Sequence, residues 1–217
     1  MRGPGLVLDL DGTLVDSVES ITRAFAAAVA EGGHAPIPEA LVRARIGEPL
    51  VAMFEDLLAV PEKEADALAA VYREHYAMIA PRLVKPLPGV PDLLDAWGLP
   101  MAVATTKRTD QAELVLDALG LRYRFVDVIG IDRAAGPKPH PAPVLEAALS
   151  LGLPPSRCVV IGDTKYDVLA ARAAGAPSIG VLTGAGTRAS LEAAGADLVV
   201  PDLRALDPSL FAKLAPR

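Results

Sequence analysis

The acidic side chains best placed to do chemistry follow two short apolar runs of the chain. Asp9 and Asp11 come after residues 6–8, and Asp163 and Asp167 come after residues 158–161. Carboxylates that gather in one crevice repel each other, by about 4 kcal/mol for two unit charges 4 Å apart at an effective dielectric constant near 20. A hard divalent cation relieves this repulsion, and oxygen ligands without His or Cys favour Mg²⁺ over zinc. The pattern therefore predicts a magnesium site.

Two other polar residues stand at comparable places, Thr105 after residues 101–104 and Lys138 in a loop farther along. Several of these positions also have an ordinary explanation. Thr105 suits a β-branched strand position, Lys138 an exposed loop, and Asp163 a helix N-cap. The pair Asp9-Leu10-Asp11 gains nothing from packing after a buried strand. This pair is therefore the strongest indication of a functional site.

The elements that must position these groups alternate between strands and helices over much of the chain. We expect strands over residues 6–10, 101–105, 126–131, 158–161, 178–182 and 198–200, and helices over 111–119, 143–151 and 168–174. Strands separated by helices form a parallel sheet that is buried on both faces. Ligands of such sheets bind outside the carboxyl ends of the strands, which is where the polar residues lie.

Residues 17–80 contain only helical patterns. The segment Asp16-Ser17-Val18-Glu19 resembles a capping box and opens a helix that Gly32-Gly33 end. Shorter helices over 39–46 and 50–58 flank Gly47-Glu48-Pro49, and an amphipathic helix runs over 62–79. We therefore expect an α/β fold with a Rossmann-like parallel sheet core of residues 1–14 and 86–217. An all-helical cap of residues 15–85 is inserted into it.

The composition excludes several classes of protein. The 217 residues carry a formal net charge of −6, and 52% of them are hydrophobic, which excludes a wholly disordered chain and disfavours nucleic acid as a partner. No apolar run is long enough to span a membrane, and the first apolar run is too short for a signal peptide. The single cysteine, Cys158, is expected to be an inert core thiol in a cytoplasmic protein.

The spacing of these residues carries a family resemblance. Asp9-Leu10-Asp11-Gly12-Thr13 is similar to the first motif of the haloacid dehalogenase-like superfamily, in its phosphatase branch. Thr105, Gly136-Pro137-Lys138-Pro139 and the stretch from Gly162-Asp163 to Asp167 resemble the second, third and fourth motifs, in the family's order. The helical insert, with its Ile46-Gly47-Glu48-Pro49-Leu50 segment, resembles the small cap of the group that includes phosphoglycolate phosphatase.

The resemblance implies a role for each acidic residue. Asp9 is implied as the nucleophile that forms a phosphoaspartate, and Asp11 as the general acid and base. The implied Mg²⁺ ligands are the side chains of Asp9 and Asp163 and the backbone carbonyl of Asp11. Asp167 is implied as an outer residue that holds Lys138 or a metal-bound water.

It also implies groups that bind the phosphate and the leaving group. Thr105 is expected to donate its hydroxyl to a phosphoryl oxygen, and Lys138 to add a positive charge and orient Asp9. Gly12, Thr106, Gly47 and Glu48 are expected to contact the substrate, with Arg45 a weaker candidate. Relatives often have Asn where this chain has Thr106, and Pro where it has Arg108, so contacts at these positions are expected to differ.

The expected function is hydrolysis of a small phosphorylated metabolite, with 2-phosphoglycolate as one candidate, by a monomer or homodimer. A phosphosugar mutase keeps both Asp9 and Asp11 and stays open as an alternative. A metal-free dehalogenase and a phosphonate hydrolase are disfavoured because Asp11 is present. A phosphate-binding module without activity is disfavoured because none of the four motifs is missing.

Overall fold

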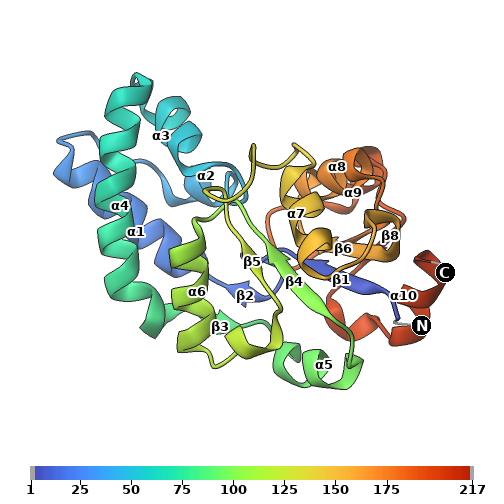
Figure 1. The fold of residues 1–217 in the computed structure, drawn as a ribbon. Helices are drawn as coiled ribbons and strands as arrows, with labels where there is room; N and C mark the ends of the chain where they lie inside the picture. The colour runs from blue at the N-terminus through green and yellow to red at the C-terminus, as the bar shows by residue number, and fades with distance from the viewer. Residues whose placement is uncertain (1–2, 216–217) are drawn as a thin grey trace.

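The computed structural model describes residues 3–215, so the first two and last two residues of the predicted core lie outside the described range. Within that range the chain forms an α/β core with a group of helices at one side (Figure 1). The main sheet has six parallel strands in the order β5-β4-β1-β6-β7-β8. Their bounds are β1 (Gly5–Leu8), β4 (Met101–Ala104), β5 (Val128–Ile129), β6 (Cys158–Gly162), β7 (Ser178–Val181) and β8 (Leu198–Val200). The predicted fold class is confirmed.

The helices fall into an insert and a core set. The insert holds α1 (Val18–Glu31), α2 (Glu39–Arg43), α3 (Leu50–Leu58) and α4 (Glu62–Leu83). The core holds α5 (Val90–Trp97), α6 (Thr109–Ala118), α7 (Ala142–Ser150), α8 (Lys165–Ala174), α9 (Arg188–Ala194) and α10 (Pro208–Leu214). Three 3₁₀ turns lie at Arg122–Arg124, Pro155–Arg157 and Leu203–Ala205. None of the described helices combines the length and the apolar composition needed to cross a bilayer.

Both faces of the sheet are covered by helices. Side chains of a strand alternate between faces, so Leu6 and Leu8 pack into a cluster that includes residues of α5, α6 and α10, while Val7 packs with residues of α7 and α8. The strands are buried along their whole length in β1, β4 and β6. Burial on both faces explains why the strand sequences are continuously apolar rather than alternating.

A two-stranded antiparallel ribbon joins the insert to the core. It pairs β2 (Val15–Asp16) with β3 (Lys85–Pro86), so both passages of the chain between core and insert lie side by side. The sequence did not predict this ribbon, because two residues per strand are too few to show a period. The division of the chain at residues 15 and 85 stays a proposal.

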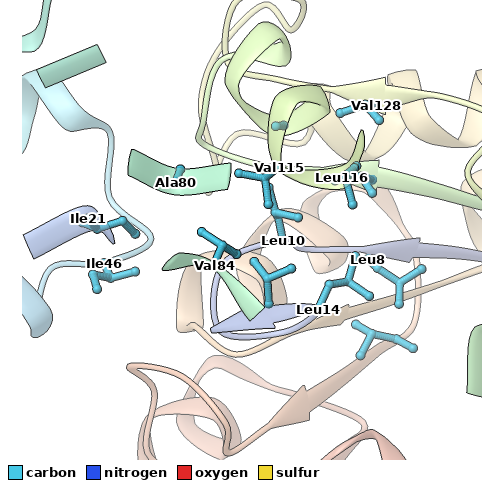
Figure 2. Packing of buried hydrophobic residues seen from close by; sticks show 14 of the residues in the cluster. Leu8, Leu10, Leu14, Ile21, Ile46, Ala80, Val84, Val115, Leu116 and Val128 are labelled. Atoms are coloured by element: carbon cyan, nitrogen blue, oxygen red, sulfur yellow. The ribbon is translucent and has the colours of Figure 1, made fainter. Parts of the chain in front are cut away.

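The insert packs on the core through apolar contacts. Leu10 and Leu14 of the core belong to the same buried cluster as Ile21 and Ile46 of the insert and Val84 at its end (Figure 2). Within the insert, the rings of Phe25 and Phe54 stack with centroids 4.3 Å apart. The insert is therefore seated against the carboxyl ends of the strands by a continuous apolar layer.

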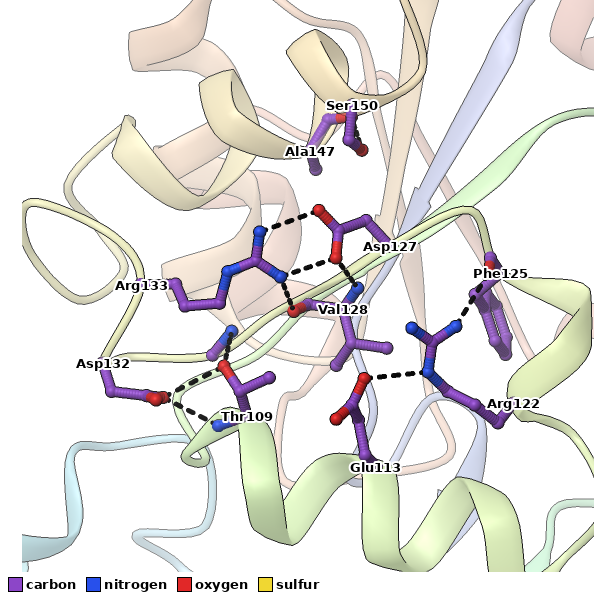
Figure 3. A network of polar contacts seen from close by, with 11 residues as sticks. Thr109, Glu113, Arg122, Phe125, Asp127, Val128, Asp132, Arg133, Ala147 and Ser150 are labelled. Carbon is purple, nitrogen blue, oxygen red and sulfur yellow. Dashed lines mark hydrogen bonds and ion pairs between the residues drawn. The ribbon is translucent and has the colours of Figure 1, made fainter.

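Several predicted boundaries are wrong for identifiable reasons. The strand expected over residues 126–131 is reduced to Val128–Ile129. The residues beside it are joined by a two-bond ion pair between Asp127 and Arg133 (Figure 3). The capping box expected over Asp16-Ser17-Val18-Glu19 does not form. Helix α1 begins after Ser17, whose hydroxyl makes no capping bond and donates to Asp11. Helix α8 begins three residues early, at Lys165, where Thr164 and Asp167 form a capping box.

Candidate active site

Parallel pairing brings the four sequence motifs to one edge of the sheet. Strand β1 lies between β4 and β6, so Asp9, Thr105 and Asp163 follow three adjacent strand ends. Lys138 comes from the loop between β5 and α7, and Asp167 from the first turn of α8. All five side chains are buried. Residues more than 150 positions apart, such as Asp9 and Asp163, are thereby brought close together, as expected for adjacent strand ends.

Lys138 joins two of these acids. Its ammonium nitrogen lies 2.6 Å from Oδ1 of Asp9 and 2.5 Å from Oδ1 of Asp167, and it also donates to the carbonyl of Ala104 at 3.1 Å. Burial alone would disfavour the charged ammonium, but the two carboxylates outweigh it and hold the pKa of Lys138 above its usual range. The lysine is therefore a fixed positive charge between Asp9 and Asp167.

One lysine does not neutralise the acids around it. Oxygen atoms of Asp9, Asp163 and Asp167 all lie within 4.8 Å of one another. Burial, opposed by Lys138 and aided by Asp167, raises the pKa of Asp9 to about 7, and burial together with Asp9 raises the pKa of Asp163 well above its usual range. A hard divalent cation fits this donor set of buried carboxylate oxygens. Asp167, predicted outside the metal shell, lies in this cluster as well as beside Lys138.

A glycine-rich loop after β7 completes the setting of Asp163. The backbone N–H of Ala185 donates to Oδ2 of Asp163 at 2.9 Å, and the hydroxyl of Thr13 donates to Oδ1 at 3.2 Å. A Cβ on Gly184 would lie 1.9 Å from that Oδ2, so only glycine fits there. This loop was not predicted, although Gly184 and Gly186, which follow soon after a predicted strand, are a usable signal.

Asp11 is held from two sides. The hydroxyl of Ser17 donates to its Oδ1 at 2.5 Å, and the ammonium nitrogen of Lys107 lies 3.2 Å from its Oδ2. The side chains of Lys107 and Asp11 are only 7% and 10% exposed. Burial opposes the charge on Lys107, but Asp11 outweighs it and raises the pKa of the lysine. Neither Ser17 nor Lys107 was among the predicted site residues.

A cavity of about 140 Å³ lies beside Asp11, between core and insert. The predicted substrate residues Thr106, Gly47 and Glu48 line it. Gly12 does not; it lines a separate cavity of about 80 Å³ near the ribbon. The remaining walls are largely apolar and come from both parts of the chain, including Ile21, Ile46, Leu50, Met53, Tyr72 and Ile131.

The Gly47-Glu48 turn forms the contact between the insert and α8. Gly47 has φ +103°, and a Cβ there would lie 2.8 Å from Cγ2 of Thr164. Glu48 accepts hydrogen bonds from Tyr166 at 3.1 Å and from Arg45 at 3.0 Å. Arg45 also pairs with Asp56 at 2.6 Å. The charge of Glu48 is therefore balanced, and Arg45 supports this turn.

Two arginines add positive charge to the cavity wall. Arg73 of α4 is half-buried, and among the described residues its guanidinium has no hydrogen bond or ion pair. Arg108 pairs with the exposed Asp110 at 3.2 Å. The segment that carries Arg108 is fixed by Asp132, which accepts hydrogen bonds from the backbone and the hydroxyl of Thr109 (Figure 3). Because Lys107, Glu48 and Arg108 all have ion-pair partners, Arg73 is the cavity-lining charge without one among the described residues.

Comparison with known proteins agrees with this geometry. The family model described as haloacid dehalogenase-like hydrolase matches residues 6–181. The chain is 38% identical over 206 residues to "Probable phosphatase IndB" of Dickeya dadantii (strain 3937), covering 91% of this chain and 89% of that one. It is also 38% identical over 186 residues to "Phosphoglycolate phosphatase" of Xylella fastidiosa (strain 9a5c), covering 82% and 80%. A solved structure described as "a predicted phosphatase from Clostridium acetobutylicum" superposes with a TM-score of 0.86 at 26% identity, covering 99% of both chains. This chain belongs to the haloacid dehalogenase-like hydrolase family.

Proposed function

We propose that the protein is an Mg²⁺-dependent phosphatase that hydrolyses a small phosphomonoester through an aspartyl-phosphate intermediate. Residues 15–85 act as a cap over the site. The observation that supports this most directly is the buried group of Asp9, Asp163 and Asp167 with Lys138 in contact with two of them. The family membership and the relatives named as phosphatases agree with it.

In the first step a carboxylate oxygen of Asp9 attacks phosphorus, and the bond from phosphorus to the leaving oxygen breaks. That oxygen takes the proton of the Asp11 carboxyl, so the leaving group departs as a neutral alcohol. Lys138 holds the attacking carboxylate at 2.6 Å. The hydroxyl of Thr105 accepts from the backbone of Lys107 at 3.2 Å, so its own hydrogen can be donated to a phosphoryl oxygen.

In the second step a water molecule attacks phosphorus and gives a proton to the Asp11 carboxylate. The bond between phosphorus and Asp9 breaks, which releases inorganic phosphate and regenerates both acids. The apolar layer between the insert and the core keeps other water out of the crevice. Mg²⁺, held by Asp9, Asp163 and the backbone carbonyl of Asp11, would neutralise the repulsion between the phosphate and the carboxylates.

The cavity beside Asp11 favours a short leaving group with an anionic end. Its volume of about 140 Å³ is well below the roughly 300–1,000 Å³ of pockets for drug-sized ligands. Arg73 and Arg108 can bind a carboxylate there. Both features suit 2-phosphoglycolate, and a relative that carries that substrate in its name is 38% identical over 186 residues.

The test is phosphate release from a panel of phosphorylated metabolites, scored by kcat/KM with excess Mg²⁺ or with excess chelator. We expect release that requires Mg²⁺ and is fastest for small carboxylated esters. Equal rates with chelator would remove the metal from the mechanism. Isomerisation of a phosphosugar that outpaces net hydrolysis, and requires a bisphosphate, would identify a mutase instead.

A further inference from the structure

Lys107 lies between a carboxylate of the core and an aromatic ring of the insert. Its ammonium nitrogen is 3.2 Å from Oδ2 of Asp11 and 4.2 Å from the centroid of the Tyr76 ring. Tyr76 belongs to α4 and is fully buried. A cation over an aromatic face is attracted by the ring, more strongly where water is excluded. The lysine is thus held by one group from each part of the chain.

The backbone of Lys107 is fixed independently of its side chain. Its N–H donates to the hydroxyl of Thr105 at 3.2 Å, and its carbonyl accepts from the backbone of Ile131 at 3.0 Å. The side chain therefore starts from a fixed point in the turn after β4. A fixed start and two partners leave the ammonium little freedom to move away from Asp11.

The two carboxylate oxygens of Asp11 have different partners. Oδ1 accepts from Ser17, the residue just before the insert's first helix, and Oδ2 faces Lys107. An acid that must reach the leaving oxygen needs a defined rotamer, because a small misplacement of a reacting group costs a large part of the rate. Ser17 and Lys107 together define that rotamer.

We propose that Lys107, supported by the ring of Tyr76, is a positioning residue that aims the Asp11 carboxyl at the leaving oxygen when the insert is seated on the core. This inference rests on the proposed function and gives a role to a residue that was not among the predicted site residues. It also makes proton delivery depend on the insert, because displacing α4 takes away the ring that holds Lys107.

Two substrates of nearly the same shape test the inference, an acyl phosphate and a phosphate ester. Acetyl phosphate releases a carboxylate, which needs no proton at pH 7, whereas ethyl phosphate releases an alkoxide, which does. Lys107→Met keeps the length of the side chain and removes its charge. The quantity to measure is kcat/KM for each substrate at saturating Mg²⁺, since it reports the step that breaks the bond to the leaving group.

We expect Lys107→Met to lower kcat/KM for ethyl phosphate about 10-fold or more beyond its effect on acetyl phosphate. This is part of the roughly 10²–10⁴-fold that general acid catalysis contributes. Lys107→Arg, which retains the charge, should recover part of the difference. Equal losses on both substrates would show that the lysine only binds phosphate or supports the fold, and would overturn the inference.

Variants of Tyr76 test the part played by the insert. Tyr76→Phe keeps the ring and should keep the wild-type ratio of the two kcat/KM values, whereas Tyr76→Leu should lower ethyl phosphate turnover selectively. The same ratio in both variants would contradict the role of the ring. Lys63→Met, an exposed change on the same helix, serves as the control and should leave both rates unchanged.

The outcome for the wild-type protein separates this inference from the proposed function. A wild type that releases no phosphate from either substrate overturns both. A wild type that is active on both substrates, with an unselective Lys107→Met, overturns the role of Lys107 and leaves the phosphatase function standing.

Discussion

The ammonium nitrogen of Lys138 and Oδ1 of Asp9 lie 2.6 Å apart, although 129 positions of sequence separate the two residues. The same ammonium contacts Asp167. Asp163 lies close to both acids but forms no ion pair with a lysine among the described residues. The lysine is thus a partial counter-charge for a group of acids. Repulsion between these buried carboxylates lowers the free energy of unfolding, and a bound cation would reduce that repulsion.

Lys138→Met should lower the free energy of unfolding in chelator by about 3–5 kcal/mol, because it leaves buried carboxylates uncompensated. Excess Mg²⁺ should restore a part of the loss by binding only the folded state. Urea unfolding in both conditions measures the two effects. Lys213→Met, at an exposed position of α10, is the control, and a similar small effect for both variants would contradict the account.

Asp9→Asn should lower kcat by about 10³-fold or more, as expected for loss of a nucleophile. The side chain keeps its size, so the variant should still fold. Steady-state phosphate release measures the rate, and trapping of labelled phosphate on the protein should occur only with Asp9 intact. Asp117→Asn, an exposed change on α6, should retain full activity. A labelled Asp9→Asn protein would reassign the nucleophile.

Gly47→Ala should disturb both stability and catalysis. An alanine at φ +103° costs about 1–2 kcal/mol, and its Cβ would press on Thr164 at 2.8 Å. Gly33→Ala is a matched control, because Gly33 has φ +76° but nothing within 4 Å of the added Cβ. Both variants should lower the free energy of unfolding, while only Gly47→Ala should lower kcat/KM. Equal kcat/KM values in the two variants would show that the Gly47-Glu48 turn does not affect catalysis.

Arg73→Met should raise KM for carboxylated phosphomonoesters by about 10-fold or more, since hydrogen bonds to a charged group contribute about 1.5–3 kcal/mol. KM for ethyl phosphate, whose leaving group carries no carboxylate, should change little. Comparing 2-phosphoglycolate with ethyl phosphate in the two proteins gives the answer. A parallel rise for both esters would place Arg73 at the phosphate rather than at the leaving group.

Cys158 should resist alkylation in the folded protein. It is fully buried in β6, and burial raises its pKa to about 11. Iodoacetamide at pH 8 should therefore modify it only after unfolding. Because the folded pKa exceeds the unfolded value, the fold loses stability as the pH rises from about 9 to 11. Thermal unfolding across this range should show the loss, and Cys158→Ala should remove that component of it.

The strand ends could be predicted because apolar runs followed by acids are visible in the sequence. Asp9, Thr105 and Asp163 emerge at adjacent strand ends, as that reasoning expects. Their chemical roles, the cytoplasmic location and the monomeric or homodimeric state stay predictions. The fold class and the family are confirmed.

The partners of Asp11 could not be predicted, because they depend on tertiary contacts. Ser17 has the sequence of a helix cap, and only the folded chain turns its hydroxyl toward Asp11. Lys107 follows the second motif, as in relatives, but its contact with Tyr76 arises only when α4 packs against the core. Helices α5, α9 and α10 were also not predicted; they are short, at seven or eight residues each, and too brief to show a clear period.

The ribbon of β2 and β3 has a consequence for how such proteins can diversify. Val15 lies opposite Pro86 and Asp16 opposite Lys85, so everything between them enters and leaves the core through neighbouring positions. The intervening segment can be exchanged for one of another length without moving the strands that carry the acids. On the proposed function, selectivity for the alcohol portion of an ester can thus change with the insert, provided that the ring against Lys107 and the hydroxyl that binds Asp11 are retained.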